Sequence, residues 1–190
     1  MSTVEIINIA LARLGESPIQ SLDEGTVPAN TAKLFYGPAR RATLRDYNWI
    51  FALKTNRLAK LAESPIDFCF AYALPSDCLR PVRLRSEGVP DFLGNGPRFV
   101  VREGKLLTNA DPANLEYVFD CEDPEKFDDK FIEAMSYKLA SDMAMTVKGS
   151  AEMTERYSRE YQARVTQAAA LSGNENRDTS GDNPYVEARD

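Results

Sequence analysis

The spacing of apolar residues changes twice along this chain, and this change limits the possible folds more than any other feature. Near both ends, apolar residues recur every three or four positions, which is typical of helices. Between residues 50 and 121 they form short runs rich in Val, Leu, Phe and Tyr, separated by Pro, Gly, Asn and Asp. Such runs are typical of antiparallel strands. The sequence therefore predicts helices at both ends and a sheet between them.

Two helices are predicted before the strand-rich region. Ser2 and Glu5 have the spacing of a capping box, and Gly15 supplies a stop for the first helix. A second helix is expected to begin near Thr26. Because Pro38 lies inside it, we expect a kink or a break, and two short helices joined by a loop remain an alternative.

Two further helices are predicted after Asp123. The first has apolar residues at steps of four, namely Phe127, Phe131, Met135, Leu139, Met143 and Val147. Gly149 is expected to end it, and Ser150 to cap the next one. The apolar face of that last helix is expected to hold Met153, Tyr157, Tyr161, Ala168 and Leu171. The short link predicts an antiparallel helical hairpin.

These elements predict an α+β fold, in which residues 1–49 and 123–172 form a four-helix bundle. Residues 50–122 are expected to form an inserted antiparallel β-rich domain. Residues 173–190 are polar and are expected to form an extended, flexible C-terminal arm. The single tryptophan, Trp49, lies where the bundle would meet the insertion, so we predict that it packs at the joint.

Composition excludes much enzyme chemistry. The chain has no histidine, which removes Ser-His and Cys-His pairs, and its three cysteines form no CxxC motif. No P-loop, GxGxxG motif or Ca²⁺-loop pattern is present. The acidic residues in 122–129 are explained by their place at a helix start. We therefore expect no catalytic residues, no metal and no cofactor.

The net charge and the apolar runs of the chain limit the kinds of partner that it could bind. The net charge of −6 argues against tight DNA binding, although residues 1–60 are net basic. No apolar run is long enough to cross a membrane, and the N-terminus lacks the features of a secretory signal. We expect synthesis in the cytoplasm and no membrane partner.

Two arginine clusters and one apolar pair are candidate contact residues. The first cluster lies on the second helix and contains Arg40, Arg41 and Arg45. It could bind phosphates, although a solvated or ion-paired face is the commoner explanation. The second, on a predicted strand, is placed at a sheet edge or an interface and contains Arg80, Arg83 and Arg85. In the polar arm, Tyr185 and Val186 could anchor on a partner, although an idle tail is equally common.

Four stretches, in order, resemble the tail tubular protein A family of short-tailed phages. They are IINIALARLGESPIQSLDEG, ANTAKLFYGPARRATLRDYNWIFAL, FAYALPSDCLRPVRL and KFDDKFIEAMSYKLASDMAMTVKGS, followed by a helix. PYVEAR near the end also resembles the family's terminus. The resemblance covers most of residues 5–170, and its specificity lies in the order of the stretches, because none of them is diagnostic by itself.

The resemblance implies a structural virion protein of the tail, an adaptor in the head-to-tail connector. Such proteins form a ring of about twelve copies, a homododecamer, between the portal protein and a tail nozzle built of tail tubular protein B-like subunits. Double-stranded DNA would pass through the ring without specific contacts. Tyr185, Val186 and Arg189 would become ordered on the portal or a neighbouring subunit, and the β-rich domain with its three arginines would face the nozzle or another interface.

Other functions stay open at this point. One alternative is a different phage connector, such as a head-completion or tail-terminator protein, which differs in subunit count and binding partner and is not separated by the sequence. A glycan hydrolase could use two carboxylates, for example Asp77 and Glu87, or members of the 122–129 cluster. A DNA-binding regulator is disfavoured by the net acidity and the lack of a convincing recognition helix.

Overall fold

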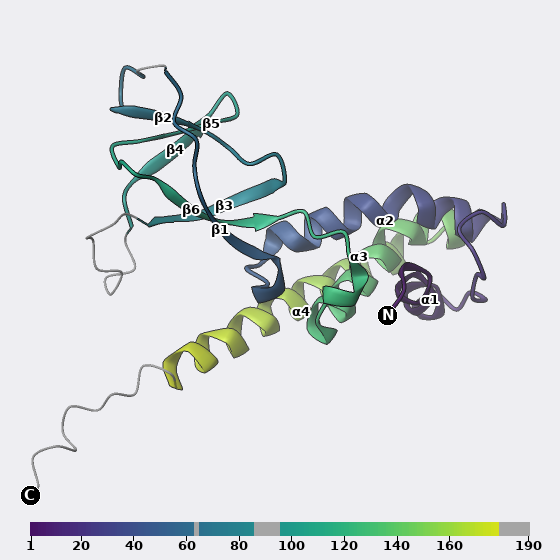
Figure 1. Cartoon of the computed structure of the whole chain (residues 1–190). Coiled ribbons are helices and arrows are strands. Elements are labelled where there is room, and N and C mark those ends of the chain that lie inside the picture. Colours follow the sequence, from purple (N-terminus) through teal and green to yellow (C-terminus); the bar gives the residue numbers. More distant parts are fainter. Residues whose placement is uncertain (63–64, 86–95, 179–190) are drawn as a thin grey trace, which may run out of the picture. The chain divides into compact units, whose positions relative to one another are not determined.

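The structure, a computed structural model, describes residues 1–62, 65–85 and 96–178 (Figure 1). Its helices are α1 (Thr3–Arg13), α2 (Val27–Asp46), α3 (Asp129–Lys148) and α4 (Ala151–Asp178). Its strands are β1 (Leu53–Arg57), β2 (Phe70–Ala73), β3 (Cys78–Arg85), β4 (Phe99–Arg102), β5 (Lys105–Thr108) and β6 (Asn114–Phe119). Short 3₁₀ helices occupy Ile50–Ala52 and Pro124–Lys126. The predicted mixed α+β class is confirmed.

The chain divides into two compact units, which are described separately below. Residues 1–39 and 128–190 form the helical unit, and residues 40–127 form the β unit. The first boundary lies inside α2, after Ala39, and the second lies after Phe127.

Capping residues fix the ends of the helices in the helical unit. The Ser2 side chain accepts a hydrogen bond from the Glu5 backbone N–H, and the Glu5 carboxylate accepts one from the Ser2 N–H, so the predicted capping box is present. At the other end of the unit, α3 ends at Gly149, whose φ of +62° is the left-handed conformation that glycine adopts most easily. Both predicted helix ends are confirmed.

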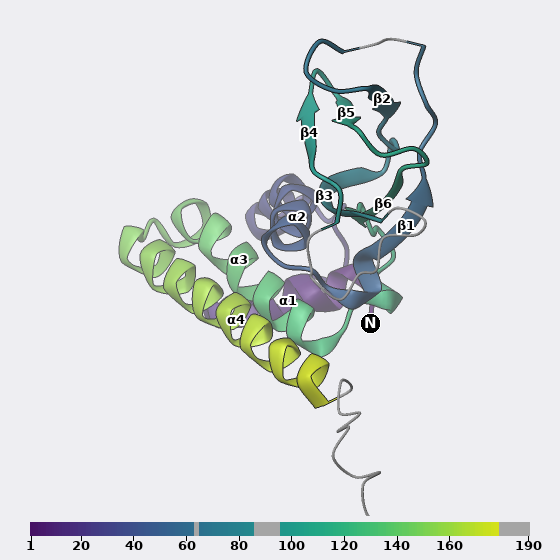
Figure 2. The same cartoon turned by 90° about the vertical axis from the view of Figure 1, so that its left-hand side faces the viewer.

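One apolar core joins the elements of the helical unit. It includes Leu11 of α1, Ala32 of α2, Leu139 and Met143 of α3, and Tyr157 of α4. Figures 1 and 2 show α3 and α4 running antiparallel side by side, as the short link predicted, whereas α1 crosses the direction of α2.

The proline in α2 does not break the helix. Helix α2 is continuous from Val27 to Asp46 with Pro38 inside it, so the alternative of two short helices is wrong. Proline removes the hydrogen bond from its own nitrogen to the carbonyl four residues earlier, that of Leu34. Both Pro38 and Leu34 lie on the exposed side of α2, where water can replace the missing donor.

The β unit contains two three-stranded antiparallel sheets, with strand orders β1-β6-β3 and β2-β5-β4. Strands β4 and β5 pair from Arg102–Lys105 to Phe99–Thr108 across a two-residue turn. In this turn Glu103 and Gly104 both have positive φ, 51° and 73°. The hairpin predicted at these two residues is therefore confirmed. The core of the unit is formed by side chains of both sheets, among them Tyr72, Leu106 and Tyr117.

Candidate interaction surfaces

Trp49 is anchored inside the β unit. Its side chain is 2% exposed, and its Nε1 donates a hydrogen bond of 2.8 Å to the Thr43 carbonyl oxygen near the end of α2. The Tyr47 ring meets it edge-on, with 5.0 Å between the ring centroids. These contacts hold the backbone in place just after the end of α2. The role of Trp49 at a joint between domains stays a prediction.

Arg80, on β3, caps the C-terminal end of α2. Its Nε donates to the Arg45 carbonyl oxygen at 2.8 Å, and its Nη2 donates to Asn48 Oδ1 at 2.6 Å. The last carbonyl groups of a helix lack partners within the helix, and a cation near them is favoured by the helix dipole. The guanidinium that we proposed for an interface therefore also has an intramolecular role.

Arg83 and Arg85 both bind one carboxylate, that of Glu116 on β6. The Glu116 Oε2 atom lies 3.1 Å from Arg83 Nη2 and 2.7 Å from Arg85 Nη2. Burial alone would raise the pKa of Glu116, but the hydrogen bonds from Arg85 and Arg83 outweigh it and lower this pKa. The arginine side chains stay 39% and 47% exposed, so their outer surfaces remain candidates for an interface.

Two arginines of α2 within the β unit, Arg40 and Arg41, form ion pairs. Arg40 is 5% exposed and lies 2.7 Å from Asp120 and 3.2 Å from Glu122. Arg41 lies 3.1 Å from the other oxygen of Asp120. The ion-paired interpretation is correct for these two, and Arg40 is too buried to meet an external phosphate.

Asp77, one proposed catalytic carboxylate, is held by two neighbours. Lys54 Nζ lies 2.8 Å from its Oδ2, and the Tyr117 hydroxyl donates to its Oδ1 at 3.0 Å. The hydrogen bond from Lys54 lowers the pKa of Asp77, which favours the ionised form and disfavours a general acid. Its suggested companion, Glu87, lies outside the described residues.

Two aspartates in 122–129 serve as helix caps. The Asp123 side chain accepts from the Glu125 backbone N–H at 3.1 Å, and Asp128 accepts from the Phe131 N–H at 2.6 Å. The interpretation of this cluster as a helix start is correct for both. Among the described residues, no group of three His, Cys, Asp or Glu side chains is placed to hold a metal ion.

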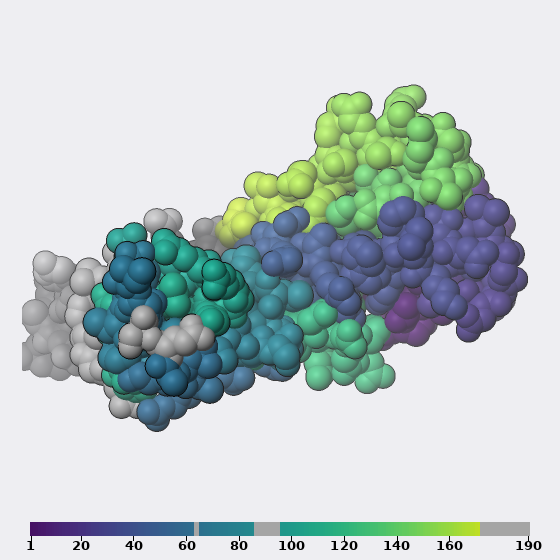
Figure 3. Space-filling model, turned by 90° about the horizontal axis from the view of Figure 1, so that it is seen from above, coloured from purple at the N-terminus to yellow at the C-terminus, as the bar shows by residue number. Residues whose placement is uncertain are grey.

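Sequence reasoning missed two surface features of the helical unit. One is a pair of exposed apolar side chains on α2, Val27 at 61% and Leu34 at 68%. Figure 3 shows the surface of α2 facing the viewer. The spacing of seven residues could have revealed this pair, because it places both on one helix side.

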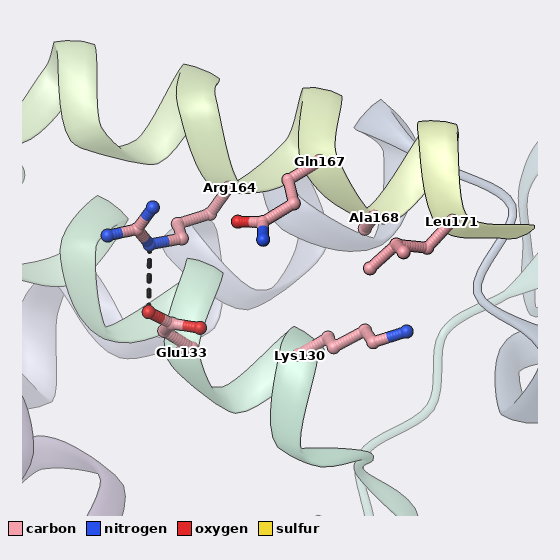
Figure 4. Close-up of a pocket in the computed structure, with 6 residues that line it drawn as sticks. All are labelled: Lys130, Glu133, Arg164, Gln167, Ala168 and Leu171. Carbon is pink, nitrogen blue, oxygen red and sulfur yellow. Dashed lines mark ion pairs between the residues drawn. The ribbon is translucent and has the colours of Figure 1, made fainter.

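The other missed feature is a hollow of about 200 Å³ between α3 and α4. We call it the α3–α4 hollow; it is lined by Lys130, Glu133, Arg164, Gln167, Ala168 and Leu171 (Figure 4). Arg164 Nε lies 2.8 Å from Glu133 Oε1 across its wall. Leu171, which we expected on the buried face of α4, is instead 40% exposed at one end of the hollow.

The predicted C-terminal anchor, Tyr185, Val186 and Arg189, lies outside the described residues. In the part of the chain that is described, no helix has the length and apolar character needed to cross a bilayer. Comparison of the sequence with models of protein families and with curated proteins gave no match.

Proposed function

We propose that this protein is a structural assembly subunit, the adaptor that joins the portal to the tail nozzle in the head-to-tail connector of a short-tailed phage. The four ordered stretches that resemble the tail tubular protein A family support this proposal. The mixed α+β architecture is consistent with it. The finer arrangement, a four-helix bundle carrying an inserted β domain, is part of the same proposal.

The observation that carries the proposal is that several polar side chains make contacts within the fold, whereas apolar side chains on α2 are exposed. Asp77, Glu116 and Arg80 stabilise the β unit, and Asp128 caps α3, so these groups serve the fold. In contrast, large apolar side chains on the outside of α2 remain exposed. We assign these two exposed side chains, Val27 and Leu34, to contacts with other proteins.

The distribution of charge fits a protein that lets DNA pass. Residues 40–127 carry 13 basic and 13 acidic side chains, whereas the rest of the chain carries 10 basic and 16 acidic ones. The entire net charge of −6 therefore belongs to the residues of the helical unit. If this unit lines the channel, its field repels DNA phosphates and keeps contacts weak.

The test is electron microscopy of purified phage particles, combined with mass spectrometry to identify this chain. We expect a ring of about twelve copies below the portal, with closed cyclic symmetry. Absence of the chain from the particles would contradict the proposal and would direct attention to assays of glycan hydrolysis.

A truncated chain tests the proposed portal anchor. Deleting residues 179–190 removes Tyr185, Val186 and Arg189 and leaves α4 as the structure describes it. We expect the truncated protein to keep its circular dichroism spectrum and to lose binding to portal-containing particles. The control is the full-length chain with Asp182→Asn, which changes one charge and keeps the apolar pair. Undiminished binding by the truncated chain would contradict the anchor.

A further inference from the structure

The α3–α4 hollow combines apolar side chains with a cation. Ala168 is 4% exposed and Leu171 is 40% exposed. Figure 4 shows the Leu171 side chain reaching into the space between the helices, with the side chain of Lys130 extending beneath it. An occupant of this space would therefore meet an apolar surface and an ammonium group together.

Two polar side chains of the hollow have no partner within the described ranges. Neither Lys130 nor Gln167 makes a hydrogen bond or an ion pair with another described residue, and both are exposed. Arg164, in contrast, lies 2.8 Å from Glu133 and 3.4 Å from Glu160, so these carboxylates neutralise it. The hollow thus offers one cation and one amide to a ligand that carries an acceptor.

The sequence that follows α4 has matching chemistry. Residues 179–190 carry three acidic side chains and one basic one, a net charge of −2. Within them, Tyr185 and Glu187 are two residues apart, so in an extended segment both side chains point to the same side. A tyrosine has an apolar ring with a polar tip, which suits a wall that is apolar in one part and polar in another.

This segment is also long enough to reach the hollow. Helix α4 ends at Asp178, seven residues after Leu171, which corresponds to about 10 Å along the helix axis. Tyr185 lies seven residues beyond Asp178, and an extended chain of this length spans up to about 23 Å. The chain must reverse its direction, and both Gly181 and the pair Asn183-Pro184 are typical of turns.

We propose that Tyr185 and Glu187 dock in the α3–α4 hollow of their own chain before the protein assembles. The Tyr185 ring covers Leu171 and its hydroxyl bonds to the Gln167 amide, while the Glu187 carboxylate pairs with Lys130. A short connection keeps the effective concentration of the segment high, so a weak contact is sufficient.

The consequence for assembly rests on the proposed function. Tyr185 also belongs to the proposed portal anchor, and one side chain cannot occupy both places. The intramolecular contact therefore competes with portal binding, and the portal must displace it. Such competition keeps the anchor from binding other surfaces before a portal is present.

Site-specific photo-cross-linking in the full chain tests the contact. Ala170→p-benzoylphenylalanine places the probe three residues from Gln167 on the same side of α4 and keeps every proposed contact residue. An equal mixture of ¹⁵N-labelled and unlabelled protein separates links within one copy from links between copies. With monomeric protein we expect single-isotope links to residues 179–190. Absence of these links would overturn the proposal, and mixed-isotope links would assign the hollow to a second copy and overturn it too.

Chymotrypsin cleavage after Tyr185 supplies a second measurement, because a docked Tyr185 is cleaved only after it leaves the hollow. Lys130→Glu replaces attraction of Glu187 by repulsion and should raise the initial cleavage rate about threefold or more. Lys130→Arg should keep the original rate. Arg159→Glu makes the same charge change at a 73% exposed side chain of α4 outside the hollow and should have little effect. Equal rates for Lys130→Glu and Arg159→Glu would overturn the proposal.

The outcome is distinguishable from that of the proposed function. A ring in phage particles, combined with a free chain that gives no links from the hollow to residues 179–190, would overturn this contact and leave the adaptor role intact. Links of this kind in a protein that is absent from particles would support the contact and contradict the adaptor role.

Discussion

Replacing Trp49 tests whether this side chain holds the chain as it leaves α2. A buried tryptophan removes about 200 Å² from water, which at about 25 cal/mol per Å² corresponds to at most about 5 kcal/mol. Measured costs of large-to-small changes agree with this value, so Trp49→Ala should lower the free energy of unfolding by about 3–5 kcal/mol. Trp49→Phe keeps most of the ring but removes the donor to the Thr43 carbonyl, and should cost about 1–3 kcal/mol.

The assay for these variants is urea unfolding followed by circular dichroism. Fluorescence is unsuitable because Trp49 is the only tryptophan in the chain. The control is Ile50→Ala, because the neighbouring Ile50 side chain is 74% exposed and its loss should change stability by less than about 0.5 kcal/mol. A cost below about 1 kcal/mol for Trp49→Ala would refute the packing argument.

Three further predictions concern the fold. Arg80→Ala should lower the free energy of unfolding by about 1–2 kcal/mol, because the Arg45 carbonyl and Asn48 lose their donor; the control Arg98→Ala should change it little. Gly149→Ala should cost about 1–2 kcal/mol from its positive φ alone, since a Cβ there meets nothing within 4 Å, and Gly149→Asn should cost less. The lowered pKa of Glu116 contributes stability that is present above the unfolded-state pKa of about 4.3 and is lost as pH falls through the folded value. Urea unfolding across this acidic range should therefore show a smaller loss in Glu116→Gln than in the original chain, and an equal loss would contradict the ion-pair argument.

Local sequence signals predicted the local structure well. The capping box at Ser2 and Glu5, the helix end at Gly149 and the hairpin turn at Glu103–Gly104 each depend on a few adjacent residues. Their backbone requirements are specific enough to be recognised without knowledge of the rest of the chain. The break considered at Pro38 is absent, because the effect of a proline depends on whether water reaches the carbonyl group that loses its donor, and exposure is not a local property.

Contacts between distant residues could not be predicted in this way. Arg80 caps a helix end 35 residues earlier in the chain, and Arg83 and Arg85 meet Glu116 across two strands. From the sequence, these three arginines were equally plausible as solvent-exposed interface residues. Only the pairing of β3 with β6 brings Arg83 and Arg85 to the carboxylate. The α3–α4 hollow has the same origin, because residues of two different helices line it.

The positions of the ion pairs and of the exposed apolar side chains together favour assembly over chemistry. The β unit has balanced charges, and several of its arginines and carboxylates neutralise one another within the fold. Such pairing stabilises the β unit and neutralises charged groups that could otherwise act on a substrate. The residues of the helical unit instead combine net negative charge with two exposed apolar side chains on α2, Val27 and Leu34. Because Val27 and Leu34 are exposed, we expect charged substitutions at these two positions to leave the fold intact, and a loss of assembly in such variants would support the proposed role.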